Sequence, residues 1–325
     1  MAVRGWGGSV IAAIGIAAGA GAAQFGLGYG LGIIAWLPSG DDGSDAIWVG
    51  NLAWTIWIGA TATALGAVGA QRLTPAGATA GEATGPASSP STLTTVLARL
   101  TLAVAASLGA LTTVALVAIP ARAATRADTF SPQTIAAGHA VVGVLCGLLV
   151  ALWTLASRAA ARNLLLTTGW LWLLAVIAVA DCALRGAGFA PAQPGVWKLT
   201  GDSAAFWIGN YIYWPGAMVS LGAALAIGAV AAWPVARRSI NRVSTAISGG
   251  VGPLLVATAY FLAAPRLAGV HDEQLSAHLL APYGVIVGLA GSVLVTALAQ
   301  RPVRRTTGPR RTESTTRTAD PALST

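Results

Sequence analysis

Two asparagines inside apolar stretches carry the polar groups best placed to bind a ligand. The chain reads AIWVGN up to Asn51 and AFWIGN up to Asn210. If the first stretch is helical, Trp48 lies on the same face as Asn51. In the second stretch, Trp207 and Trp214 would lie on the face of Asn210. An amide in an apolar environment needs a hydrogen-bond partner, so both amides are expected to point into the protein. They would either line one shared ligand site or only join helices and cap helix ends.

Aromatic side chains gather around the same two stretches. The group consists of Trp36, Trp48, Trp54, Trp57, Trp197, Trp207, Tyr211, Tyr213 and Trp214. Aromatic rings can form the wall of a pocket for a lipid headgroup, a sugar or a cation. Trp54, Tyr213 and Trp214 are candidates for that wall, together with the tryptophans that precede the two asparagines. The alternative is the belt of Trp and Tyr that membrane proteins place at the two membrane surfaces.

One carboxylate, Asp181, lies within an apolar stretch, and Arg185 follows it by one helical turn. A buried acid can couple proton or ion movement, and His139 is the residue best placed to assist it. The ordinary alternative is an ion pair at the membrane surface. His271 and His278 flank two acids in a later loop, but this spacing does not specify a metal, so no metal site is expected.

The short motifs that mark common catalytic and nucleotide sites are absent from the sequence. It contains no GxxxxGK[ST] loop, no CxxC pair, no HExxH and no GxSxG. We therefore name no catalytic residue and expect no cofactor.

Composition places these residues in a membrane protein. Charged residues make up 9% of 325, whereas about a quarter is usual in soluble domains. The net charge of +8 would suit a nucleic-acid partner, but the arginines lie between apolar blocks and in the tail. Membrane topology explains that distribution, so the expected partner is the lipid bilayer and not nucleic acid.

Eight apolar blocks are long enough to cross a bilayer as helices. They cover roughly residues 9–36, 47–70, 94–118, 134–156, 164–184, 207–232, 243–264 and 280–299. The first block resembles a secretory signal peptide, but its apolar stretch continues to Trp36, so we expect an uncleaved span. Its many glycines predict a central, closely packed helix. The predicted fold is an all-α polytopic transmembrane bundle of about eight spans.

The basic residues predict the orientation of the bundle. With the N-terminus inside, only Arg122, Arg126, Arg185, Lys198 and Arg266 of the 19 basic residues lie outside. Cytoplasmic loops are enriched in arginine and lysine, so both termini are expected in the cytoplasm. The near absence of lysine and the heavy use of alanine and glycine are typical of a high-GC bacterial genome, which predicts a bacterial plasma membrane.

The two halves of the chain resemble each other and predict a 4+4 parallel internal repeat. The AIWVGN and AFWIGN stretches correspond, and Val142-Gly143 corresponds to Val287-Gly288. The predicted parts are spans 1–2 (1–72), a disordered linker (73–92), spans 3–4 (93–163), spans 5–8 (164–300) and a disordered basic tail (301–325). The alternative is chance similarity among helices rich in Ala, Gly and Leu.

Three classes of function fit these features. The first is a transporter-like or lipid-handling protein with a lipid or small-molecule site between the two halves. The second is a non-catalytic subunit or scaffold that binds other membrane proteins. The third is a membrane-embedded enzyme that acts on a lipid.

Overall fold

A computed structural model describes residues 6–38, 44–73, 91–124, 131–184, 206–207, 211–238, 241–267, 270 and 272–299. Its elements are α1 (Trp6–Gly30), α2 (Ser44–Leu73), α3 (Thr92–Ala110), α4 (Thr112–Ala121), α5 (Pro132–Ala156), α6 (Arg158–Leu184), β1 (Phe206–Trp207), β2 (Ile212–Tyr213), α7 (Trp214–Ala236), α8 (Arg242–Ala246), the 3-10 turn η2 (Ile247–Gly250), α9 (Val251–Ala263) and α10 (Asp272–Leu298). Most of the expected linker and the whole expected tail lie outside the described residues.

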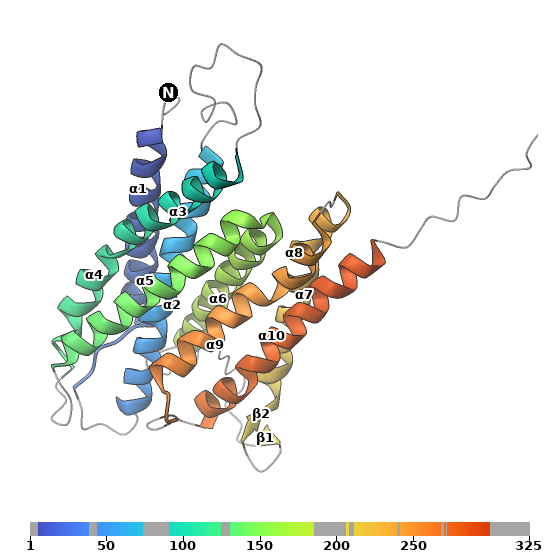
Figure 1. Ribbon diagram of the computed structural model, residues 1–325. Coiled ribbons are helices and arrows are strands. Elements are labelled where there is room, and N and C mark those ends of the chain that lie inside the picture. Colours follow the sequence, from blue (N-terminus) through green and yellow to red (C-terminus); the bar gives the residue numbers. More distant parts are fainter. Residues whose placement is uncertain are drawn as a thin grey trace, which may run out of the picture.

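Eight helices of the described chain are long and apolar enough to cross a membrane, as the sequence predicts. Two of these spans are interrupted: α3 and α4 form one, and α8, η2 and α9 form another. The beginning of α1 and the end of α10 lie at the same end of the bundle (Figure 1). Large apolar side chains such as Leu149 and Leu173 are exposed on the outside, where lipid would cover them.

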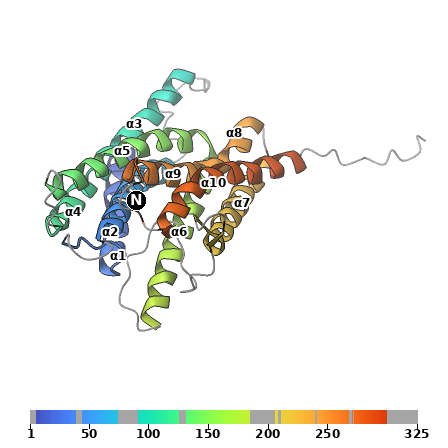
Figure 2. The same cartoon turned by 90° about the horizontal axis from the view of Figure 1, so that it is seen from below.

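The spans gather around α2, which is the most deeply buried helix of the bundle. In its most apolar stretch 89% of the residues are buried, against 28% in α1. Trp54 and Trp57 on α2 are completely buried. Seen along the bundle, α1 to α5 lie on one side, α7, α8 and α10 lie on the other, and α6 and α9 lie between them (Figure 2). The expectation that α1 is the central helix is therefore wrong.

Glycines allow neighbouring helices to approach closely, and two helix pairs illustrate this. A Cβ on Gly143 of α5 would lie 2.5 Å from the carbonyl oxygen of Ile56 on α2. A Cβ on Gly291 of α10 would lie 2.3 Å from the carbonyl oxygen of Leu225 on α7. Small residues at such contacts supply close backbone packing where lipid offers no hydrophobic driving force.

The interruption before α9 follows from Pro253 and from the glycines at 249, 250 and 252 that precede it. Pro253 has no N–H, so the carbonyl of Gly249, one turn earlier, lacks its helical donor. The side-chain amide of Asn163 donates to that carbonyl at 3.2 Å, and its oxygen accepts the N–H of Gly252 at 2.8 Å. The N–H of Gly249 donates to the hydroxyl of Ser292. Irregular backbone is tolerated at this depth because buried side chains satisfy it.

The sixth span begins later than expected, at Trp214 and not at residue 207. Before it, β1 and β2 pair antiparallel, with Phe206 opposite Tyr213 and Trp207 opposite Ile212. Pro215 in the first turn of α7 favours a helix start there, and aromatic and β-branched residues favour strands before it. Trp207 is therefore not on a helix.

Candidate functional site

The amide of Asn51 is used within the protein. Its oxygen accepts the N–H of Ala35 at 3.3 Å, and its nitrogen donates to the carbonyl of the same residue. The side chain is 1% exposed. These bonds hold the segment after α1 against the first turns of α2. Asn210, its expected partner in a shared site, lies outside the described residues, so the paired site stays a prediction.

The described candidate aromatic side chains make separate contacts. Trp48 packs edge-on against Trp36, with ring centroids 5.3 Å apart. The ring of Trp54 packs at a tilt of 33° against that of Trp172 on α6, with centroids 4.8 Å apart. Trp214, at the start of α7, is 40% exposed. Only Tyr213 among the described candidates lines the cavity identified below.

His139 and Asp181 are both partly exposed, and neither lines that cavity. The Nδ1 atom of His139 lies 2.8 Å from the carbonyl oxygen of Ile135, one turn earlier in α5. Asp181 lies in the last turn of α6. In the described part of the chain, no group of three or more His, Cys, Asp or Glu residues could hold a metal.

A polar network around Gln24 joins three spans inside the bundle. The side-chain oxygen of Gln24 on α1 accepts the hydroxyl of Thr61 on α2 at 3.0 Å. The same oxygen accepts the indole N–H of Trp172 on α6 at 3.0 Å. All three side chains are buried. These polar atoms bond to one another within the protein. The network therefore holds the three helices together and is not a ligand site.

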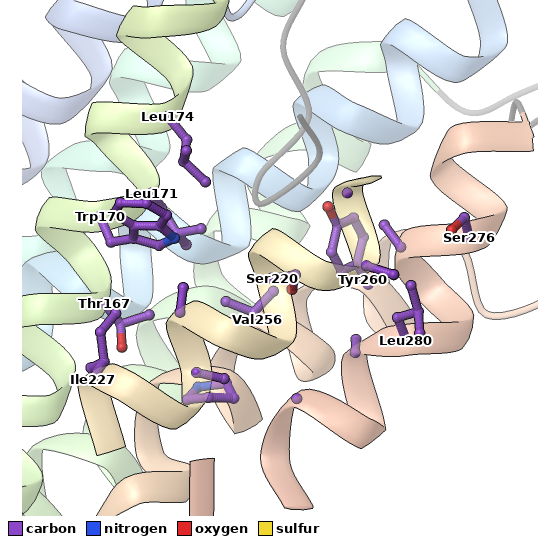
Figure 3. A pocket seen from close by; sticks show the side chains of 18 of the residues that line it. Thr167, Trp170, Leu171, Leu174, Ser220, Ile227, Val256, Tyr260, Ser276 and Leu280 are labelled. Atoms are coloured by element: carbon purple, nitrogen blue, oxygen red, sulfur yellow. The ribbon is translucent and has the colours of Figure 1, made fainter. Parts of the chain in front are cut away.

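The candidate functional site is a cavity between α6, α7, α9 and α10. Figure 3 shows Thr167, Trp170 and Leu174 on α6 and, across the cavity, Tyr260 and Leu280. The residues that line it are Thr167, Trp170, Leu171, Leu174, Tyr213, Gly216, Ala217, Ser220, Ala223, Ala224, Ile227, Pro253, Val256, Tyr260, Ser276, Ala277, Leu280, Ala281 and Gly284. The space that the centre of a water molecule can reach is about 70 Å³. The cavity is thus large enough for more than one water molecule or for part of a lipid chain.

The cavity adjoins a shallower groove on the outside of α6 and α7. Trp170, Ala223 and Ile227 belong to both. The groove also includes Met218, which is 53% exposed, and Gly222. The cavity and the groove are therefore neighbours, with Trp170, Ala223 and Ile227 at the boundary between them.

The polar groups of the cavity are mainly hydroxyls. Among the described residues that line it, none carries a charge. Ser276 accepts the N–H of Tyr213 at 2.9 Å and so joins α10 to the hairpin before α7. The hydroxyl of Thr167 is buried and has no hydrogen-bond partner in the described structure. The sequence did not mark Thr167, because threonines are common in these spans and their hydroxyls usually bond within their own helix.

Comparison with models of known protein families, with curated proteins and with solved structures found no match for this chain. The eight long apolar helices of the described chain are consistent with a multi-pass helical membrane protein. Any more specific function has to be inferred from the cavity itself.

Proposed function

We propose that this protein handles a lipid and binds an apolar lipid chain in the cavity between α6, α7, α9 and α10. The observation that carries the proposal is an uncharged cavity that shares Trp170, Ala223 and Ile227 with a groove on the outside of α7. Ligand pockets are mostly apolar, with a few polar groups that orient the ligand. A charged solute would lose its hydration in this cavity without gaining a counter-ion.

The route of entry is lateral, from the membrane between α6 and α7. Only 22% of the most apolar stretch of α7 is buried, which makes α7 a helix at the edge of the bundle. Thr167 and Leu174 are separated by seven residues of helix, or about 10 Å along α6. A lipid chain that enters beside Trp170 can therefore contact several turns of α6.

Native mass spectrometry of the purified protein tests this proposal. Wild-type protein, purified in mild detergent, is expected to retain a co-purified lipid. Replacing Ala223 by Phe should fill the opening and lower lipid occupancy at least fivefold. The matched control is Val230→Phe, because Val230 lies on the same helix, is 61% exposed and does not line the cavity. Equal occupancy in all three proteins would refute a lipid site at this position.

The proposed membrane is the bacterial plasma membrane, with both ends of the chain in the cytoplasm. Supporting this orientation, α2 ends and α6 begins toward the end of the bundle where α1 begins (Figure 1), with Arg72 in the last turn of α2 and Arg158 as the first residue of α6. The test uses a chain in which Cys146 and Cys182 are replaced by Ser. A membrane-impermeant maleimide should label Ser131→Cys in intact cells and Asn241→Cys only after permeabilisation. The reverse labelling pattern would reject this orientation.

We also propose that the two halves of the bundle are copies of one four-span unit. In each half the second span packs against the fourth, as α2 does with α5 and α7 with α10. The first span packs against the second and third in both halves. The third span is interrupted in both, at Leu111 and at η2. In this arrangement the cavity lies within the second half. The first half contacts the second through α2, which packs against α9.

A second candidate function is that of a partner subunit for other membrane proteins. It is favoured by one face of α1, where a Cβ on Gly15, Gly19, Gly26 or Gly30 would meet no other atom within 4 Å. Small residues on an open helix face allow another helix to approach closely. Replacing Gly19 by Leu would then abolish co-purification of a partner without changing lipid occupancy.

A further inference from the structure

A cluster of arginines lies where α6 begins and α7 ends, at one end of the bundle (Figure 1). The helices α6, α7 and α8 contact one another there. The cluster consists of Arg158 and Arg162 in the first two turns of α6, Arg237 and Arg238 directly after α7, and Arg242 at the start of α8. The sequence contains no Asp or Glu from residue 129 to 180 or from 203 to 271. The acidic residues of the described chain lie at the other end, for example Asp45 in the first turn of α2. No described acid therefore neutralises this cluster.

Arg237 is distinguished from the other arginines by its place on α7. Membrane topology alone would put arginines at this end, so their charge by itself selects no ligand. The guanidinium of Arg237 lies over the ring of Trp233, 4.1 Å from its centroid, within the range of a cation–π contact. Trp233 is 41% exposed and follows the groove residue Ala226 by seven positions, so both lie on the same face of the helix. This face of α7 therefore runs from the apolar groove past an exposed tryptophan to a cation.

The distance between this cation and the groove matches the length of a lipid chain. The helices α6 and α7 run in opposite directions, and Trp170 and Ile227 both border the cavity and the groove. Arg237 follows Ile227 by about 15 Å of helix, and Arg162 precedes Trp170 by about 12 Å. The two cations therefore lie at similar distances from the opening. One leaflet of the hydrocarbon core is about 15 Å thick, so a lipid whose phosphate lies at Arg237 can place the end of its chain in the opening.

From these observations we infer that the bound lipid is an anionic phospholipid from the leaflet at this end of the bundle. Its phosphate binds the guanidinium of Arg237, and one acyl chain lies in the groove of α7 and enters the cavity beside Trp170. This inference rests on the proposed lipid-handling function. Guanidinium groups form strong, paired hydrogen bonds with phosphate oxygens, and the other arginines of the cluster add positive potential. The charge stays at the membrane surface, so the uncharged cavity receives only the chain.

Two lipids with the same acyl chains and the same phosphodiester make a matched pair of probes. Dioleoylphosphatidylglycerol is anionic, whereas dioleoylphosphatidylcholine has no net charge. Binding of each to delipidated protein is measured by native mass spectrometry. Wild-type protein should bind the phosphatidylglycerol roughly tenfold more tightly. Arg237→Gln should weaken that binding about fivefold, equivalent to ~1 kcal/mol for one basic residue near the membrane surface, and leave phosphatidylcholine binding unchanged. Arg237→Lys keeps the charge and should retain most of the preference.

The matched control is Arg72→Gln, which removes an exposed arginine in the last turn of α2, at the same end of the bundle but outside the groove. It should leave phosphatidylglycerol binding unchanged. An equal loss in Arg72→Gln and Arg237→Gln would mean that only diffuse surface charge attracts the lipid, and would overturn the assigned site.

Two further outcomes separate this inference from the proposed function. Excess inorganic phosphate should not displace phosphatidylglycerol, because the chain contributes to binding; complete displacement would show a site for free phosphate instead. If Ala223→Phe abolishes binding of both lipids but wild-type protein binds both equally well, the lipid cavity stands and the assigned headgroup is wrong. If wild-type protein binds neither lipid, the proposed function fails as well.

Discussion

The indole N–H of Trp172 on α6 donates a 3.0 Å hydrogen bond to the side-chain oxygen of Gln24 on α1, a residue 148 positions earlier in the chain. The ring of Trp172 also packs at a tilt against Trp54 of α2. This one side chain therefore contacts two spans of the first half of the chain and lies on the helix that forms one wall of the cavity. It holds the wall in place relative to the rest of the bundle.

A double-mutant cycle measures the contact between Gln24 and Trp172. Hydrogen bonds between membrane helices contribute on the order of 0.6 kcal/mol on average and up to about 1.7. Gln24→Leu and Trp172→Phe should each lower the free energy of unfolding in detergent, and the double variant should show a coupling of about 1 kcal/mol. Additive losses within about 0.3 kcal/mol would mean that the two side chains do not interact.

The loss of Asn163 should destabilise the irregular start of α9. Asn163→Ala removes the donor to the carbonyl of Gly249 and the acceptor for the N–H of Gly252. Both backbone groups are buried, so the variant should lose about 2–4 kcal/mol of stability. Hydrogen exchange should show faster exchange at Gly252 than in the wild type. Asn163→Asp can still accept from Gly252 but brings a buried charge, so it should not restore stability. Unchanged exchange at Gly252 would contradict this role.

Replacing Asn51 should affect folding and leave lipid occupancy unchanged. Its amide bonds to both backbone groups of Ala35, and Asn51→Ala leaves these groups without their partner. We expect a loss of about 1–3 kcal/mol in the free energy of unfolding. Native mass spectrometry should show the same bound lipid as in the wild type. A lost ligand with unchanged stability would instead support the ligand site that the sequence suggested for Asn51 and Asn210.

Glycine substitutions should separate helix contacts from open positions. A Cβ on Gly109 of α3 would lie 2.1 Å from the carbonyl oxygen of Ile14 on α1, so Gly109→Ala should cost about 1–3 kcal/mol. Gly169→Ala on α6 meets nothing within 4 Å and should be neutral or stabilising by up to about 1 kcal/mol. Thermal unfolding in the same detergent compares the two. Equal effects would show that α1 and α3 do not approach closely at Gly109.

The eight spans could be predicted from the sequence because a bilayer imposes a length and an apolar composition on any helix that crosses it. The local interruptions were harder to predict. The start of α7 depends on Pro215 together with strand pairing before it, and the break at η2 depends on Asn163, 86 residues away from Gly249. Long-range hydrogen bonds of this kind leave no periodic signal.

The candidate site was not predictable from the sequence for a similar reason. Thr167 and Thr168 are adjacent and identical in type, and only packing against α7 and α9 distinguishes their surroundings. Asn51 attracted attention because a polar residue in an apolar stretch is conspicuous, yet the nearby backbone of Ala35 already occupies its amide. A sequence shows which polar groups enter the membrane but not which of them the fold leaves without a partner.

The most direct test of the lipid cavity is a cryo-electron microscopy map of the protein in lipid nanodiscs. We predict elongated, non-protein density between α6 and α7 that passes Trp170 and extends between Leu171 and Leu280 in the cavity. A cavity closed by its own side chains, or one that holds only isolated water-sized peaks, would contradict the lipid-binding account.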